Sequence, residues 1–411
     1  MEGGHSSLCC FGFNIMEGTT FLTVGSSHGY KLCSLDSTNN LKFIYDNKTD
    51  EPLNPVELVF SKCGIATFGT SWPRRLYINH SGERKEIEYP DDIKSIKLNG
   101  WRLVTCLEES LRIYGIRGDK MKKIYQISNT PRNSRGLIAL ANSQENCFLA
   151  YPGNHLDVGS VQIFDVANMQ AGISIPAHKS VLAALAFDRS GSKLATASVK
   201  GTIIRVFDTL KGNKIAEFRR GSSPAIIYSL SFSFDSAFLS VSSNTPTIHI
   251  FKLETKPEPE PIVESQRWSW DWGWKTIKNA VTTTAIGCIP QIIADAYNPE
   301  RNFAFVYLCS PGIKISSFVL VNEDLYLFVA SENGFLYIYS FDKISKGFCS
   351  LITQHRFVEQ LDNSSCDIFL SESTVFVSDL NLLHFSNHGD IKVTIDDDEE
   401  LSSSFEFVNL D

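Results

Sequence analysis

The stretch TASVKGTIIRVF, residues 196–207, joins a small, serine-containing segment to an extended segment through a turn that contains Gly201. The second half is rich in β-branched and aromatic side chains and alternates with period two. Such composition and spacing are typical of a β-strand rather than of a helix. The stretch therefore predicts a strand–turn–strand unit.

The same pattern recurs along the chain. It is found at Val24-GSSHGYKLCSL, Phe68-GTSWPRRLYIN, Thr105-CLEESLRIY, Tyr151-PGNHLDVGSVQIF, Thr196-ASVKGTIIRVF, Val241-SSNTPTIHIF and Val329-ASENGFLYIY, and the units end at successive gaps of 44, 35, 50, 43, 44 and 88 residues. A period near 44 matches the roughly 40–45 residues of a WD40-type blade. Seven copies predict an all-β fold, one seven-bladed WD40-like β-propeller that occupies residues 1–390.

The gap of 88 residues contains an insertion, residues 254–301, which we place in blade six before its last strand. Its proline-rich start (Lys256-PEPEPIVE) predicts an extended spacer. It then carries Trp268, Trp270, Trp272 and Trp274, followed by apolar residues every four positions that include Ile277 and Val281. Tryptophan favours the bilayer interface, so we expect a membrane-inserting loop. The alternative is that these aromatic residues fold back onto the propeller.

Composition limits the class of protein. The chain has 411 residues, a net charge of −8, no apolar run long enough to span a bilayer, and no signal-peptide pattern at its start. Its ten cysteines show no CxxC pair and no zinc spacing, so we expect reduced thiols in a cytoplasmic protein with no metal and no cofactor. The acidic balance argues against nucleic acid as a partner.

One pentapeptide, Gly25-Ser-Ser-His-Gly29, fits the GxSxG pattern of hydrolases. In those enzymes the serine lies on a turn between a strand and a helix. Here the strand Tyr30-KLCSL follows, and the same position recurs as a turn in other repeats. We therefore expect a protein that is not an enzyme.

Basic residues concentrate between Arg189 and Arg220, where eight lysines and arginines face only two acids. The segment ends in Phe218-Arg-Arg-Gly221. On an extended strand, neighbouring side chains point to opposite sides, so Arg219 and Arg220 would serve two separate pockets. Arginine suits phosphate because its planar fork donates two charge-assisted hydrogen bonds. The alternative is a solvated surface pair.

The surroundings of this motif resemble the PROPPIN family, the phosphoinositide-binding propellers of autophagy. The resemblance covers nearly the whole chain, with matching stretches at Leu107-EES, Gly136-LIALA, Cys147-FLAYPG, Ile175-PAHKSVLAALAFDRSGSKLATAS, Lys200-GTIIRVF, Glu217-FRRG, His249-IFKLET and Gln354-HR. Departures are Val199 and Pro246, where the family usually has acids, and Ser222-Ser-Pro224, where relatives are often basic.

The resemblance implies two lipid headgroup sites at the rim of blades five and six. Site one would use His178, Thr196, Ser198, Gly201, Thr202, Arg205 and Arg219; site two would use Arg220, Ser242, Ser243, Thr247 and His249. Both arginine side chains are expected at the rim rather than in the core. We also expect a bound phosphate to favour the charged forms of His178 and His249, so that lipid binding strengthens toward pH 6.

The resemblance further implies the ligands and partners. These are membranes with phosphatidylinositol 3-phosphate or 3,5-bisphosphate, on which the protein would recruit the lipid-transfer and conjugation machinery of autophagosome formation. The implied location is cytoplasmic, with peripheral recruitment to phagophore, autophagosomal and endosomal membranes. The rival function is a lipid-independent WD40 scaffold for protein interactions.

Two further positions are candidate protein contacts. Arg102 matches a family arginine that helps to bind partners, although a lone arginine is also a common surface residue. The acidic tail, residues 391–411, is expected to be disordered, but its Phe405 and Val408 resemble a short motif that adds a strand to ubiquitin-like autophagy modifiers.

Overall fold

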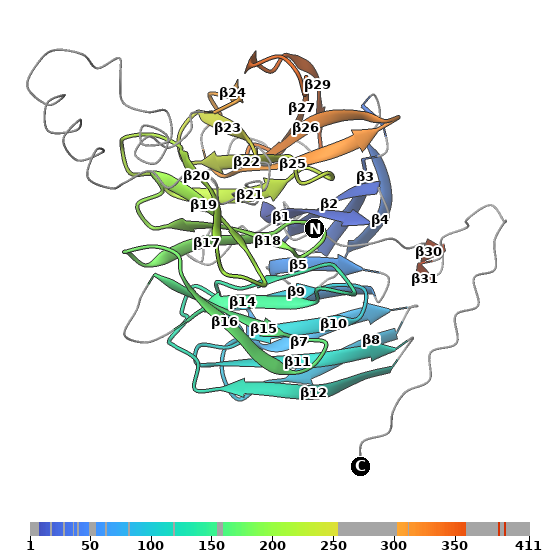
Figure 1. Cartoon of the computed structure of the whole chain (residues 1–411). Helices are drawn as coiled ribbons and strands as arrows, with labels where there is room; N and C mark the ends of the chain where they lie inside the picture. Colours follow the sequence, from blue (N-terminus) through green and yellow to red (C-terminus); the bar gives the residue numbers. More distant parts are fainter. Residues whose placement is uncertain are drawn as a thin grey trace, which may run out of the picture.

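The repeated segments form the second and third strands of seven consecutive sheets, six with four strands and one with five (Figure 1). This arrangement confirms the seven-bladed propeller. The computed structural model describes residues 8–16, 19–27, 29–35, 37–38, 41–48, 55–61, 64–80, 83–117, 120–153, 159–253, 302–310, 312–358, 385–386 and 390–391.

The first four blades follow one another along the chain. Blade one contains β1 (Leu8–Met16), β2 (Thr19–Ser26), β3 (Gly29–Ser34) and β4 (Lys42–Lys48); blade two contains β5 (Pro55–Ser61), β6 (Gly64–Gly69), β7 (Trp72–His80) and β8 (Glu83–Glu88). Blade three contains β9 (Ser95–Leu98), β10 (Arg102–Cys106), β11 (Ser110–Arg117) and β12 (Lys120–Ser128); blade four contains β13 (Ala139–Leu140), β14 (Phe148–Pro152), β15 (Ser160–Asp165) and β16 (Gln170–Pro176).

The last three blades carry the candidate site. Blade five contains β17 (Leu182–Phe187), β18 (Lys193–Ser198), β19 (Ile203–Asp208) and β20 (Lys214–Arg219); blade six contains β21 (Ile227–Phe232), β22 (Phe238–Ser243), β23 (Thr247–Lys252) and β24 (Ala304–Tyr307). Blade seven contains β25 (Lys314–Val321), β26 (Asp324–Ser331), β27 (Phe335–Ser340) and β29 (Leu351–Arg356), and a short pair, β30 (Phe385–Ser386) and β31 (Asp390–Ile391), follows.

Packing between blades accounts for the fold. The described residues form seven apolar clusters, and each one joins two neighbouring blades. Both faces of a blade are thus covered, which explains why inner strands such as β17 (LAALAF) are buried along their whole length.

Packing between side chains of blades one and seven closes the ring. One cluster combines Leu22 of blade one with Ile315 and Phe357 of blade seven. In addition, the Nε2 atom of His355 lies 2.9 Å from the carbonyl oxygen of Thr38. Blades one and seven accordingly lie side by side in Figure 1.

One strand departs from the simple repeat. The short strand β28 (Gly347–Phe348) comes from the connection between β27 and β29, but it pairs in parallel with β24 of blade six. Blade six therefore has five strands, in the order β21-β22-β23-β24-β28.

Residues 254–301, the expected insertion, fall between β23 and β24 in the chain and lie outside the described residues. The same holds for residues 392–411 of the acidic tail. The GxSxG pentapeptide connects β2 to β3, and this strand–turn–strand setting lacks the helix that a hydrolase elbow requires.

Candidate headgroup-binding site

The Phe218–Gly221 motif lies at the end of β20, the outermost strand of blade five. Phe218 is buried and stacks on Phe251 of blade six, with ring centroids 4.7 Å apart. This contact fixes the strand, so the next side chain, Arg219, points to solvent. Arg219 has no hydrogen-bond or ion-pair partner among the described residues, and it is free to bind an anion. The two arginines differ in exposure, because Arg219 is exposed and Arg220 is buried.

Arg220 is not at the rim, contrary to the sequence-based expectation. Its side chain is only 7% exposed. The Nε atom donates to the Gly201 carbonyl oxygen at 2.6 Å, and Nη2 donates to the Ser223 carbonyl oxygen. The turn before β19 and the loop after β20 fold over the guanidinium, which alternation along a strand could not reveal. Burial lowers the pKa of Arg220 from its ordinary value.

Gly201 explains how the turn reaches this arginine. Its φ of +59° lies in the left-handed region, and a Cβ atom there would stand 1.9 Å from the Ala225 carbonyl oxygen. Only glycine allows both the conformation and the close approach. Gly201 is thus a positioning residue whose own carbonyl orients Arg220.

The site-one residues His178, Thr196 and Arg205 form a connected network. His178 Nε2 lies 2.9 Å from Thr196 Oγ1, and Arg205 Nη1 lies 3.3 Å from His178 Nδ1. Arg205 also donates to the Ala177 carbonyl oxygen at 2.7 Å. Thr196 and Ser198 are buried, whereas Thr202 is half-buried near the exposed Arg219. The structure therefore brings His178, Thr196 and Arg205 together, and Arg219 is the exposed member of the predicted site one.

Glu217 was missed by the sequence reasoning. It accepts hydrogen bonds from Arg205 Nε at 2.8 Å and from Lys214 Nζ at 2.7 Å. In the structure Glu217 is the direct cross-strand neighbour of Arg205, and the sequence signal was an acid within a basic segment. Arg205 thus has a carboxylate partner already, and we assign to it a role in orienting His178 and Thr196.

The site-two serines are similarly committed. Ser242 Oγ donates to the Lys314 carbonyl oxygen at 2.6 Å and lies 2.6 Å from Ser229 Oγ. Ser243 Oγ lies 2.8 Å from Thr245 Oγ1. Both serines are fully buried, and their hydroxyls bond to neighbouring protein atoms beneath the site. Thr247 and His249 of β23 are half-buried.

His249 has a buried nitrogen without a partner. Its Nδ1 atom makes no hydrogen bond within the described structure. An unsatisfied buried polar atom costs about 1–3 kcal/mol, so such atoms call for a specific reason. A ligand hydroxyl or phosphate oxygen at site two would supply the missing partner.

Both histidines are electrically neutral near pH 7. Burial, reinforced by the nearby Arg205, lowers the pKa of His178 from 6.5 to about 4. Burial and the nearby Arg220 lower the pKa of His249 in the same way, also to about 4. These values describe the protein without a ligand; the expectation that a bound phosphate favours the charged histidines and strengthens lipid binding toward pH 6 stays a prediction.

Stability should depend on pH through these two residues. A histidine whose pKa is lower in the folded state stabilises the fold above pH 6.5, and this contribution is lost as pH falls from 6.5 toward 4. Between pH 6 and 5, each should lower the free energy of unfolding by about 1 kcal/mol. Urea unfolding of the protein and of the His249→Gln variant measures this effect. An equal pH slope in both proteins would contradict it.

Arg102 begins β10 in blade three, away from blades five and six. Its Nη1 atom donates to the Trp101 carbonyl oxygen at 3.1 Å, and its buried Nε atom has no partner within the described structure. The half-buried side chain lies over Gly115, the residue opposite it on β11. The remaining candidates, namely Trp268, Trp270, Trp272, Trp274, Ile277, Val281, Phe405 and Val408, lie outside the described residues.

Within the described part of the chain, no helix has the length and apolar character needed to cross a membrane. The same residues contain no group of three or more histidine, cysteine or acidic side chains placed to hold a metal ion.

A sequence profile described as PROPPIN matches residues 7–358. The chain belongs to the PROPPIN family. Among curated relatives, WD repeat domain phosphoinositide-interacting protein 2 of Xenopus laevis is 42% identical over 370 residues, which cover 89% of this chain and 82% of the relative. Autophagy-related protein 18 of Caenorhabditis elegans is 33% identical over 376 residues, which cover 88% of this PROPPIN and 89% of the relative.

Solved PROPPIN structures share the fold. Kluyveromyces lactis Hsv2 superposes with a TM-score of 0.62 at 18% identity and covers 86% of this chain and 99% of its own. KlAtg21, solved as a complex with the coiled coil of AgAtg16, gives a TM-score of 0.64 at 22% identity, covering 85% and 99%.

Proposed function

We propose that this PROPPIN is a phosphoinositide effector that docks on membranes through two headgroup sites and recruits autophagy machinery there. The observation that carries the proposal is the Arg219–Arg220 pair: among the described residues the exposed Arg219 has no partner, and the charge of Arg220 acts on His249, whose buried Nδ1 has no hydrogen-bond partner there. Relatives at up to 42% identity are named for phosphoinositide interaction, and another is named for autophagy.

The chemistry of the site suits phosphate monoesters. Arg219 and Thr202 offer an exposed guanidinium and a hydroxyl at site one; Arg220, Thr247 and His249 offer donors at site two. Phosphatidylinositol 3-phosphate and 3,5-bisphosphate both present such groups. The membranes that carry these lipids, those of the phagophore, autophagosome and endosome, are the proposed places of recruitment.

Vesicle flotation tests the proposal. We expect the protein to float with phosphatidylcholine vesicles that contain phosphatidylinositol 3-phosphate or 3,5-bisphosphate and to remain in the soluble fraction without them. Equal behaviour with and without these lipids would favour the lipid-independent scaffold instead. Matched vesicles with the same density of phosphatidylserine control for general attraction to negative charge.

Protein partners are proposed to bind elsewhere on the propeller. Arg102 lies on blade three, and blade four separates it from blades five and six, so a partner held there leaves the headgroup sites accessible. The solved complex of KlAtg21 shows that protein with a coiled coil. We propose an autophagy scaffold as the partner at Arg102, with an acidic group on that scaffold to satisfy the guanidinium.

The tail supplies a separate prediction. Phe405 and Val408 follow an acidic, serine-rich run, and we propose that they add a strand to a ubiquitin-like modifier. Replacing both with alanine should abolish capture of such a modifier by the full-length protein while vesicle binding stays unchanged. A variant that captures the modifier as well as the original protein does would remove this role from the tail.

A further inference from the structure

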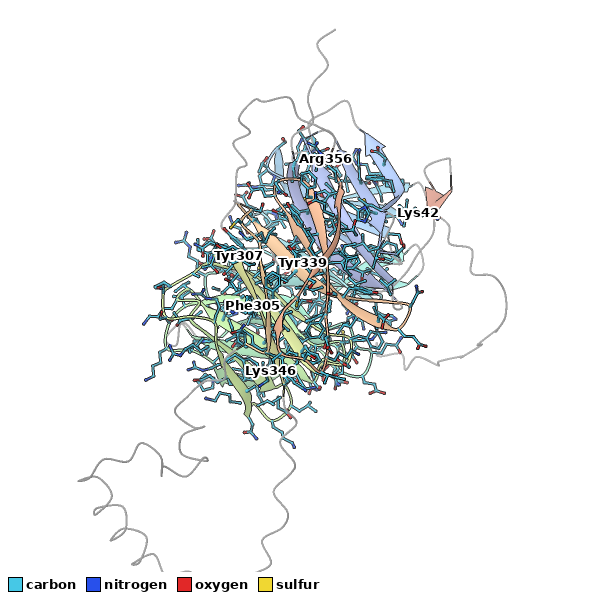
Figure 2. All side chains as sticks on the ribbon, turned by 90° about the horizontal axis from the view of Figure 1, so that it is seen from above. Lys42, Phe305, Tyr307, Tyr339, Lys346 and Arg356 are labelled. Atoms are coloured by element: carbon cyan, nitrogen blue, oxygen red, sulfur yellow. The ribbon has the colours of Figure 1, made fainter. Side chains whose placement is uncertain are left out.

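An aromatic surface lies directly beside site two. In the β23–β24 pair, Thr247 is opposite Tyr307 and His249 is opposite Phe305. Directly opposed residues of antiparallel strands share one face of the sheet. Phe305 and Tyr307 therefore extend the face of blade six that carries the site-two side chains. Figure 2 shows the two residues near each other on the outer strands of the propeller.

Blade seven adds a third ring to this surface. Phe348 of β28 pairs with Phe305, and their rings meet edge to face with centroids 5.6 Å apart. Two backbone hydrogen bonds hold the connection in place, from Gly347 N to the Phe303 oxygen at 3.1 Å and from Cys349 N to the Phe305 oxygen at 3.0 Å. The position of Phe348 is thus fixed by the sheet.

These rings are exposed to an unusual degree. Tyr307 is 55% and Phe348 is 59% exposed, although both belong to ordered strands. Neither β24 (AFVY) nor β28 (GF) contains a charged residue, and the nearest charge along β28 is the exposed Lys346. Exposed apolar surface of this kind marks an interaction site.

We propose that Tyr307 and Phe348 enter the interfacial layer of the same bilayer whose headgroup occupies site two. This inference rests on the proposed function. Adjacent strands are about 5 Å apart, so a lipid held by Thr247 and His249 places its neighbours over β24. A ring with a polar edge, such as tyrosine, suits the layer between headgroups and acyl chains. The absence of acids from β24 and β28 avoids repulsion by anionic lipids.

The surface would act alongside headgroup capture. Site two selects the lipid through its phosphate, whereas the aromatic side chains contribute apolar burial that depends on a bilayer. A soluble headgroup offers the first contact without the second. The two contributions can therefore be separated by comparing a soluble headgroup with vesicles.

The test uses the full-length variant Tyr307→Ala/Phe348→Ala. We expect it to bind soluble inositol 1,3-bisphosphate like the original protein, but to bind vesicles with phosphatidylinositol 3-phosphate about 10-fold more weakly. The control is Phe43→Ala/Tyr125→Ala, which removes two exposed aromatic rings from β4 and β12 on blades one and three. This control should bind both ligands normally.

Unchanged vesicle binding by the Tyr307→Ala/Phe348→Ala variant would overturn the inference, and so would an equal loss of binding to the soluble headgroup. Failure of the original protein to bind either ligand would instead overturn the proposed function, and the inference with it. Tyr307→Glu provides a second variant that leaves the β28 contact intact. Compared with the original protein, Tyr307→Glu should also bind vesicles more weakly, because it places a carboxylate against the anionic surface.

Discussion

Replacing Arg219 and Arg220 together with alanine is expected to reduce binding to phosphoinositide vesicles by at least about 100-fold. Two headgroup sites on one rigid scaffold make the second capture intramolecular, which multiplies a weak affinity by about 10²–10⁴. Removing one site loses this gain, and removing both leaves no specific capture. Vesicle co-sedimentation of the two single variants and the double variant measures the effect.

The two single variants should differ in stability. Arg219 is exposed and without a partner among the described residues, so Arg219→Ala should leave the unfolding temperature unchanged. Arg220→Ala removes the donors to Gly201 and Ser223 and should lower the free energy of unfolding by about 1–3 kcal/mol. Arg189→Ala is the matched control: it removes one positive charge from the same basic segment, where Arg189 lies over the Phe234 ring at 4.1 Å. Normal vesicle binding by either headgroup-site variant would contradict the assignment of that arginine.

Deleting residues 262–297 should weaken vesicle binding about 100-fold while the propeller remains folded. The deleted segment removes Trp268, Trp270, Trp272 and Trp274, whose proposed role is to enter the bilayer interface. The fold should persist because described residues on either side of this segment form the apolar clusters that join blade six to blades five and seven. Co-sedimentation and a thermal unfolding curve measure the two effects.

The same segment offers a spectroscopic readout. Tryptophan emission of the intact protein should shift to shorter wavelength when phosphoinositide vesicles are added, because the rings leave water. The deletion variant, which keeps Trp72 and Trp101, provides the background signal. Normal vesicle binding by the deletion variant would assign the insertion to another partner.

The repeat predicted the fold because each blade is built on the same strand–turn–strand unit. A unit such as residues 196–207 buries both of its faces against neighbouring blades, so the same composition and alternation recur from blade to blade in the sequence. The strand β28 could not be predicted, since Gly347 and Phe348 pair with a strand about 40 residues earlier and only two residues take part. Ring closure by His355 and Thr38 is likewise non-local.

The residues of the candidate site could be found from the motif, but not their environments. Alternation predicted that Arg219 and Arg220 point to different sides, but it could not predict the burial of Arg220, which depends on a turn that only Gly201 permits. The low pKa values of His178 and His249 arise from burial and from arginines on other strands. Glu217 was missed because its place opposite Arg205 depends on the β19–β20 register, which contains an irregularity between Val206 and Phe207.

Calorimetric titration with soluble inositol 1,3-bisphosphate tests the central claim of two headgroup sites most directly. A soluble headgroup cannot bridge sites through a membrane, so the stoichiometry counts the sites themselves. We expect two equivalents for the original protein and about one for each of Arg219→Ala and Arg220→Ala. One equivalent in the original protein would contradict the two-site account.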